Sequence, residues 1–340
     1  MREKEREKLA EFNKNILGVD FGFVQTKAVA ESFNCKFPSL VKRRSEVVIA
    51  GLEDSEGYLI TGEKGIWNVG AKGNYDFKAE RMTSEGDMAK FLAVLGLFSE
   101  AQPYSTFIDL IVSGLPVDDF KIADYKEGFA KRLKGVFKFG LGNRSHMVHV
   151  HKSLVIPQSA GGFFDFILDE EGNTNPYNAD LASEDVLVLD IGGKSSDGCI
   201  MENGLFSQDS FTIWEGVWKV HEELRKLIMQ KHRYNVPPYK MDEVLRSGAL
   251  KLGSEFIPVA DLIKIAIATR FPNLRDELSL YVPDFRRFAS ILLCGGGAYV
   301  YHELLAEATG IPVIVLDNAE YANANGYRKY GQLKLQEGLI

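Results

Sequence analysis

Two short glycine turns, each led by an aspartate, constrain the fold of this 340-residue chain more than any other feature. The first is Val19-Asp20-Phe21-Gly22, after an apolar run that begins at Ile16, and the second is Asp190-Ile191-Gly192-Gly193, after Val186-Leu187-Val188-Leu189. Glycine lets backbone N–H groups approach phosphate oxygens because no Cβ stands in the way. One such turn is weak evidence, but two of the same character predict two halves that face one phosphate-bearing ligand.

Length and charge limit the class of protein. A chain of 340 residues exceeds the roughly 100–200 residues of one domain, and 45% apolar residues are enough to fill two cores. The net charge of −7 argues against a general electrostatic grip on nucleic acid. We therefore expect two domains and no direct contact with nucleic acid.

The cysteines and the apolar segments predict a soluble, cytoplasmic protein. Cys35, Cys199 and Cys294 are too scattered for a C-x-x-C metal or redox pair, which fits a reducing compartment. Residues 1–15 form a polar N-terminal extension that lacks the apolar core of a signal peptide. No stretch approaches the roughly 20 apolar residues of a membrane span.

Strand-like runs and helical periodicity alternate along the chain, which is typical of an α/β fold. Gly161-Gly162 is expected to allow close packing of its helix. Strands are expected at 16–19, 26–30, 109–115, 137–156, 186–189, 197–201, 290–294 and 311–316, and helices at 88–98, 125–133, 158–168, 215–231, 261–270, 284–289, 299–309 and 320–330.

The residues beside the two turns predict a metal-assisted phosphate site. Asp20 and Asp190 end their strands, so both carboxylates are expected near the same phosphates, where Mg²⁺ prefers oxygen ligands and keeps its waters. Lys27 either reaches the phosphates or lies on the surface of its strand. Ser195, Ser196 and Asp197 follow the second turn, where hydroxyl groups can hold a phosphate or a metal-bound water.

A third glycine turn closes the pattern. Leu292-Leu293-Cys294-Gly295-Gly296-Gly297-Ala298 runs from a strand into a helix. Its surface carries no side chains and suits a nucleoside or a ribose-phosphate.

Three glycine turns in this order, with Ile156-Pro157-Gln158-Ser159-Ala160-Gly161 between the first two, resemble the actin-like ATPase superfamily. The segment Pro157 to Phe163 looks most like that of the plasmid-partitioning actins, the ParM/StbA group, and their archaeal relatives. The resemblance extends from Ile16 to Gly331. It implies an α/β, actin-like (ribonuclease H-like) fold of two duplicated domains with the nucleotide between them.

The resemblance also implies domain boundaries and a set of site residues. Domain I comprises 16–168 and 320–340, and domain II comprises 169–319. Interdomain connections are expected near Gln158 and in 323–327. The implied catalytic residues are Gln158, Asp190 and Asp20, with Mg²⁺ on the two aspartates through water. The implied nucleotide-binding residues are Gly22, Phe23, Val24, Lys27, Gly192, Gly193, Lys194, Ser195, Gly295, Gly296 and Gly297.

Gln158 is expected to position the attacking water, because the family has Gln or Glu at this point and a neutral amide orients water without taking its proton. The alternative is an ordinary polar residue at the start of a helix. Phe23 and Val24 replace the Ser or Thr of many relatives, so phosphate contacts there must come from the backbone. Lys194 replaces a frequent Thr and either adds a phosphate contact or points away.

The function implied by the resemblance is an ATPase that binds ATP or ADP with Mg²⁺ and assembles head to tail into filaments. An adaptor would link the filament to DNA, as in plasmid segregation, or to other cargo of a cytoskeleton. The alternative is a sugar- or acetate-type kinase of the same fold, which needs a carboxylate to accept the substrate proton. Glu222 and Glu223 either contact the nucleoside or are solvated charges.

Overall fold

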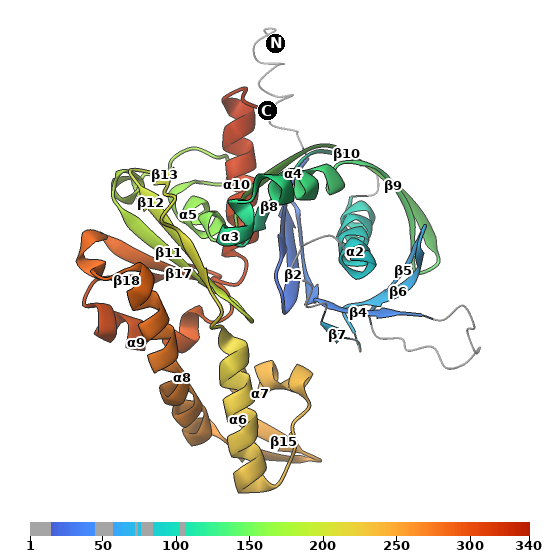
Figure 1. Cartoon of the computed structure of the whole chain (residues 1–340). Coiled ribbons are helices and arrows are strands. Elements are labelled where there is room, and N and C mark those ends of the chain that lie inside the picture. The colour runs from blue at the N-terminus through green and yellow to red at the C-terminus, as the bar shows by residue number, and fades with distance from the viewer. Residues whose placement is uncertain (1–14, 45–56, 72–73, 76–83, 103–105) are drawn as a thin grey trace.

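The computed structural model describes residues 15–44, 57–71, 74–75, 84–102 and 106–340 (Figure 1). Most of the predicted polar extension lies outside these residues. Two mixed β-sheets form the framework, and helices pack on and between them (Figure 1). Within the described part of the chain, no helix is both long enough and apolar enough to cross a membrane.

The larger sheet has ten strands and curls around helix α2 (Glu85–Ala101), which lies on its concave side (Figure 1). In spatial order its strands are β3 (Phe33–Pro38), β2 (Gln25–Ala30), β1 (Ile16–Phe21), β8 (Phe107–Leu115), β10 (Arg144–Pro157), β9 (Gly135–Leu141), β5 (Tyr58–Gly62), β6 (Gly65–Val69), β4 (Leu40–Arg43) and β7 (Asn74–Tyr75).

The smaller sheet repeats the central part of the larger one. Its order β12-β11-β17-β18 matches β2-β1-β8-β10, because in both sheets an antiparallel hairpin is followed by two parallel strands. This repeat confirms the predicted duplication. The strands are β13 (Leu205–Phe206), β12 (Ser196–Glu202), β11 (Val186–Ile191), β17 (Ser290–Cys294) and β18 (Val313–Val315), with β14 (Phe211–Ile213) paired to β12.

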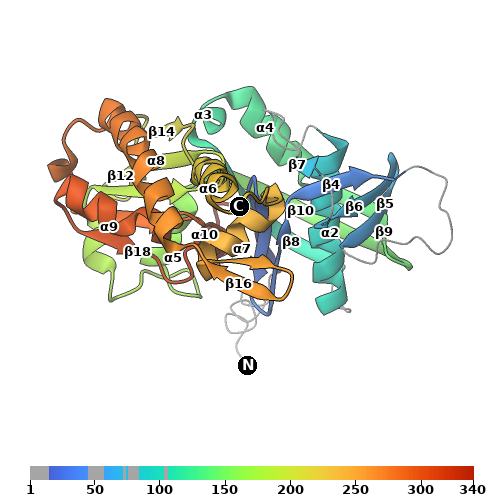
Figure 2. The same cartoon turned by 90° about the horizontal axis from the view of Figure 1, so that it is seen from below.

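The remaining helices surround the two sheets. The β15–β16 hairpin, α6 and α7 project together from the side of the smaller sheet, toward the viewer of Figure 2. These elements are α3 (Val117–Phe120), α4 (Ala123–Arg132), α5 (Ala160–Ile167), α6 (Val217–His232), α7 (Met241–Ser247), β15 (Ala249–Leu252), β16 (Glu255–Pro258), α8 (Ala260–Tyr281), α9 (Ala298–Thr309) and α10 (Ala322–Gln336).

Helices α5 and α10 join the two sheets through a shared core. Buried side chains of both sheets, such as Val112 of β8 and Val188 of β11, belong to one apolar cluster with Phe163 of α5 and Tyr327 of α10. Two further clusters fill the curl around α2 and the space beneath α6 and α8. The two halves are therefore packed against each other rather than tethered by a linker.

The crossing of α5 and α10 depends on glycine, as Gly161-Gly162 predicted. A Cβ on Gly161 would lie 2.6 Å from a ring atom of Tyr327 and 2.7 Å from the Cα of Asn323. We expect Gly161→Ala to lower the free energy of unfolding by about 2 kcal/mol or more, because the helix backbone must move. Urea denaturation measures this change. Gly128→Ala on α4, where a Cβ meets nothing within 4 Å, should be neutral or stabilising; equal effects of the two substitutions would contradict the close-packing account.

The prediction of a helix at 284–289 is wrong, and the unit formed by α7 and the β15–β16 hairpin was not predicted. Residues 284–289 form only a short 3₁₀ turn, Phe285–Arg287, at whose start the Asp284 carboxylate accepts a hydrogen bond from the Arg286 N–H. The helix before it is longer than expected and runs through Pro272 to Tyr281. Helix α7 and the β15–β16 hairpin follow the Pro237-Pro238 break, where no periodic pattern indicated either element.

Candidate functional site

All the residues predicted for catalysis and nucleotide binding line one cavity, which we call the central cavity. It lies where the two aspartate-led turns, the third glycine turn and the start of α5 meet. His221, Asp242, Arg246 and Glu320 also line it, although the sequence analysis singled out none of them. The two halves of the repeat therefore face one common space.

The first two turns are built alike. A Cβ on Gly22 would lie 2.5 Å from the carbonyl oxygen of Gln25, and a Cβ on Gly192 would lie 2.8 Å from that of Ser195. Both glycines are therefore required by the carbonyl three residues further on. The strand registers also correspond, since Asp20 pairs with Lys27 and Asp190 pairs with Asp197.

Asp20 and Asp190 lie in a buried polar cluster. The Lys27 ammonium contacts the Asp20 carboxylate at 3.2 Å. Lys27 is buried, so it is not a surface lysine of its strand. The Asp190 carboxylate accepts hydrogen bonds from the side-chain amides of Gln158, at 3.1 Å, and Asn323, at 2.7 Å. Because a carboxylate only accepts, Gln158 directs its Nε2 at Asp190, which leaves its Oε1 to accept a hydrogen from another group.

Burial and neighbouring charges shift the pKa values of Asp190 and Lys27 in this cluster. Burial raises the pKa of Asp190, and the nearby Asp20 carboxylate raises it further. Burial opposes the charge of Lys27, but attraction to Asp20 and Asp190 outweighs it and raises the Lys27 pKa. Two buried carboxylates with one lysine between them thus leave a site that favours an additional cation.

A divalent ion at this place would need further ligands. Across the described ranges, no three His, Cys, Asp or Glu side chains form a cluster that would hold a metal ion. Mg²⁺ usually keeps several waters and takes one or two carboxylates together with substrate phosphates. The residues present therefore fit an ion that arrives with a phosphate ligand.

The third glycine turn packs tightly beneath the cavity. Gly295 has a left-handed φ of 82°, and a Cβ on it would collide with the Asp190 carboxylate. A Cβ on Gly297 would lie 2.5 Å from Val217 of α6. Gly296 is open, because the nearest atom to its Cβ position is a guanidinium nitrogen of Arg246 at 4.0 Å. Only the middle glycine therefore has space above it.

The two turns touch each other across the cavity. A Cβ on Gly193 would collide with the Val24 side chain, and the Lys194 ammonium lies 5.2 Å from the Phe23 ring centre and 5.1 Å from that of Trp214. Lys194 is therefore held between two aromatic rings. The space between the turns is about 70 Å³, compared with the roughly 300–1,000 Å³ of small-molecule pockets. In this structure the central cavity is therefore smaller than a nucleotide requires.

A chain of ion pairs links the two sides at the edge of the cavity. Arg246 of α7 contacts both Asp242 and Glu320, and Glu320 contacts Lys36 of β3 at 2.9 Å. Burial alone would raise the pKa of Glu320, but the hydrogen bond from Lys36 and the charge of Arg246 lower it. These residues lie far apart in the sequence, which is why no local motif indicated them.

Two of the polar residues after the second turn have other partners. Ser196 donates to the carbonyl oxygen of Glu215, and Asp197 accepts from the Thr212 hydroxyl and from the backbone N–H of Val117. Ser195 lines the central cavity. Asp197 therefore connects the smaller sheet to α3. Ser195 remains the candidate hydroxyl for holding a phosphate or a metal-bound water.

Comparison with known proteins identifies the fold. Residues 18–161 match the family model described as the N-terminal domain of actin-like proteins. The chain has an actin-like fold. A search of curated protein sequences finds no significant match.

Solved structures agree with this fold over most of the chain. The archaeal actin homologue Ta0583 has a TM-score of 0.76 at 16% identity, with 94% of this chain and 99% of that chain covered. The actin-like protein Alp7A has a TM-score of 0.77 at 16% identity, with 95% and 97% covered. A ParM filament subunit from Clostridium botulinum has a TM-score of 0.71 at 19% identity, with 94% and 99% covered.

The titration of His221 should make the stability of the protein depend on pH. Burial lowers its pKa to about 4 from 6.5, so the unfolded chain binds the proton more tightly. The free energy of unfolding is therefore expected to fall as the pH drops below 6.5, by about 2–3 kcal/mol from this residue at pH 4.5. Urea denaturation of wild type and His221→Phe at pH 7.5 and pH 4.5 measures the difference, and an equal loss in both proteins would contradict the assignment.

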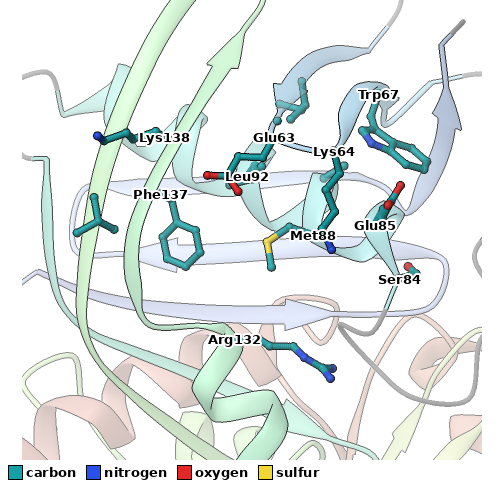
Figure 3. Close-up of a pocket in the computed structure, with 14 residues that line it drawn as sticks. Glu63, Lys64, Trp67, Ser84, Glu85, Met88, Leu92, Arg132, Phe137 and Lys138 are labelled. Atoms are coloured by element: carbon teal, nitrogen blue, oxygen red, sulfur yellow. The ribbon is translucent and has the colours of Figure 1, made fainter.

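A second cavity lies outside the predicted site. It has a volume of about 550 Å³ and lies between α2, the β5–β6 turn and β9 (Figure 3). Met88 and Phe137 line it, and Lys64 extends toward Met88 (Figure 3). No sequence motif indicated this cavity, because its walls come from segments that are separated in the chain.

Proposed function

We propose that this actin-like protein binds ATP with Mg²⁺ in the central cavity, hydrolyses it, and assembles head to tail into nucleotide-dependent filaments. One observation carries the proposal, namely the meeting of three glycine turns, two buried aspartates and Gln158 around one space. Backbone N–H groups of the turns suit phosphate oxygens, and the open face of Gly296 suits the nucleoside. The homologue Ta0583 has also been solved in complex with ADP, which supports a nucleotide ligand.

In this proposal each polar residue of the central cavity has a separate role. Asp20 and Asp190 would hold Mg²⁺ through water, the ion would neutralise phosphate charge, and Lys27 keeps the Asp20 carboxylate in place. Gln158 donates to Asp190 and orients the attacking water with its free Oε1. The proposed boundaries are 16–168 with 320–340 for domain I and 169–319 for domain II.

Nucleotide entry in this scheme requires the turns to separate. Val24 must leave Gly193, and the Arg246–Glu320–Lys36 chain must open or shift. Closure of the two sides around ATP then couples the bound nucleotide to the shape of the subunit. Non-closing, head-to-tail contacts between subunits generate filaments, and ParM and Alp12 have been solved as filaments.

Phosphate release from Mg²⁺-ATP tests the enzymatic part of this proposal. We expect hydrolysis without any added acceptor, and its loss when Mg²⁺ is chelated. Release of ADP that depends on a sugar or acetate, and exceeds the basal rate, would instead favour a small-molecule kinase. No carboxylate lies at position 158 to accept a substrate proton, which is why we favour hydrolysis.

A further inference from the structure

His221 is a buried polar residue without a polar partner. It lies on α6, only 6% exposed, and lines the central cavity. Within the described residues, neither Nδ1 nor Nε2 has a hydrogen-bond partner. Buried polar groups in folded proteins are usually hydrogen-bonded, since an unpaired one costs free energy. The buried imidazole of His221 therefore indicates a hydrogen-bond partner outside the protein chain.

Packing alone does not account for this imidazole. Its ring lies edge-on to the ring of Trp218, with ring centres 6.1 Å apart. An apolar side chain of similar size would fill the same volume without burying two nitrogens. The nearby charged groups, Asp242 and Arg246, are bonded to each other. The neutral ring thus keeps one N–H donor and one acceptor nitrogen for a ligand.

The position of His221 indicates which part of a nucleotide it meets. The first turn of α6 is anchored to the second glycine turn, where Val217 N–H donates to Gly192 and Trp218 N–H donates to Gly193. His221 comes four residues after Val217, about 6 Å along the helix axis. His221 and Gly296 both lie near the Arg246 guanidinium, since the charge of Arg246 acts on His221 and its nitrogen is the nearest atom to the open Cβ position of Gly296. In a nucleotide, the sugar is the group next to the phosphates.

We propose that His221 hydrogen-bonds a ribose hydroxyl of the bound nucleotide, so that the site selects ribonucleotides over deoxyribonucleotides. A hydroxyl both donates and accepts, so it matches either neutral tautomer of the imidazole. The ring nitrogens are buried in this structure and become available when the turns separate. This inference rests on the proposed function, because it requires a nucleotide in the central cavity.

Binding of sugar-modified nucleotides tests the inference. Calorimetric titrations use the full chain with ATP, 2′-deoxy-ATP, 3′-deoxy-ATP and inorganic tripolyphosphate. Wild type should bind at least one deoxy analogue about tenfold or more weakly than ATP, because the imidazole then stays unpaired. His221→Phe should bind ATP and both analogues with equal affinity, and should bind tripolyphosphate as wild type does. Lys226→Gln, at an exposed position of α6 that does not line the central cavity, is the matched control and should keep the wild-type preference.

The outcomes separate the two proposals. Equal discrimination by wild type and His221→Phe, or none in wild type, overturns the role of His221 while nucleotide binding stands. Absence of ATP binding to wild type contradicts the proposed function and the inference together. His221→Leu is measured in the same way if His221→Phe lowers the melting temperature, so that a packing defect does not decide the result.

Discussion

Replacing Gln158 by alanine is expected to slow ATP hydrolysis by about 100- to 1,000-fold while changing ATP affinity by less than about threefold. The amide of Gln158 is fixed by its hydrogen bond to Asp190, so its Oε1 has a defined direction for a water. Alanine removes this acceptor but leaves the glycine turns and both aspartates in place. Single-turnover hydrolysis and a separate binding titration measure the two quantities.

Two variants sharpen the Gln158 experiment. Gln158→Glu should retain substantial hydrolysis, because a carboxylate oxygen also accepts from water. Gln336→Ala removes an exposed glutamine of α10 whose side-chain amide donates to the Glu171 carbonyl, and should leave hydrolysis unchanged. Equal hydrolysis rates for wild type and Gln158→Ala would remove the water-positioning role.

Replacing Asp190 by alanine should lower Mg²⁺-dependent turnover by more than about 100-fold. The carboxylate is the shared acceptor of Gln158 and Asn323, so its loss removes a proposed metal-water ligand and also frees the catalytic amide. The raised pKa of Asp190 means that its charge opposes folding at neutral pH, so the variant should remain folded. Hydrolysis across a range of Mg²⁺ concentrations measures the effect.

Asp284→Ala is the matched control for Asp190. Asp284 caps a short turn far from the central cavity, and its loss should not alter turnover. If Asp190→Ala, checked by thermal unfolding, kept the wild-type dependence on Mg²⁺, the assignment of Asp190 to the metal side would be wrong.

Turn chemistry explains why the centre of the site could be predicted from sequence. The carbonyls of Gln25 and Ser195 lie only three residues beyond Gly22 and Gly192, so each turn is specified locally. The duplicated strand order then brings the two turns together. The roles of Phe23, Val24 and Lys194 could not be read in the same way, because their contacts reach across the cavity.

The edge of the site depends on tertiary packing. Glu320 joins Lys36 to Arg246 only after α7 and α10 have docked, and none of these residues carries a local signature. Helix α7 itself has only seven residues, too few for a clear helical period. His221 is one of several polar residues on an amphipathic helix, and only its burial without a partner separates it from Glu222 and Glu223.

The most direct test of the account is to image the full chain by electron microscopy with Mg²⁺-ATP, with Mg²⁺-ADP and without nucleotide, together with light scattering over time. Filaments should form with ATP, and should disassemble as the ATP is hydrolysed. The same filaments should persist longer with Gln158→Ala, because hydrolysis is slow in that variant. Monomers alone, across a range of salt and protein concentrations with ATP bound, would contradict the claim that this cavity couples a nucleotide to assembly.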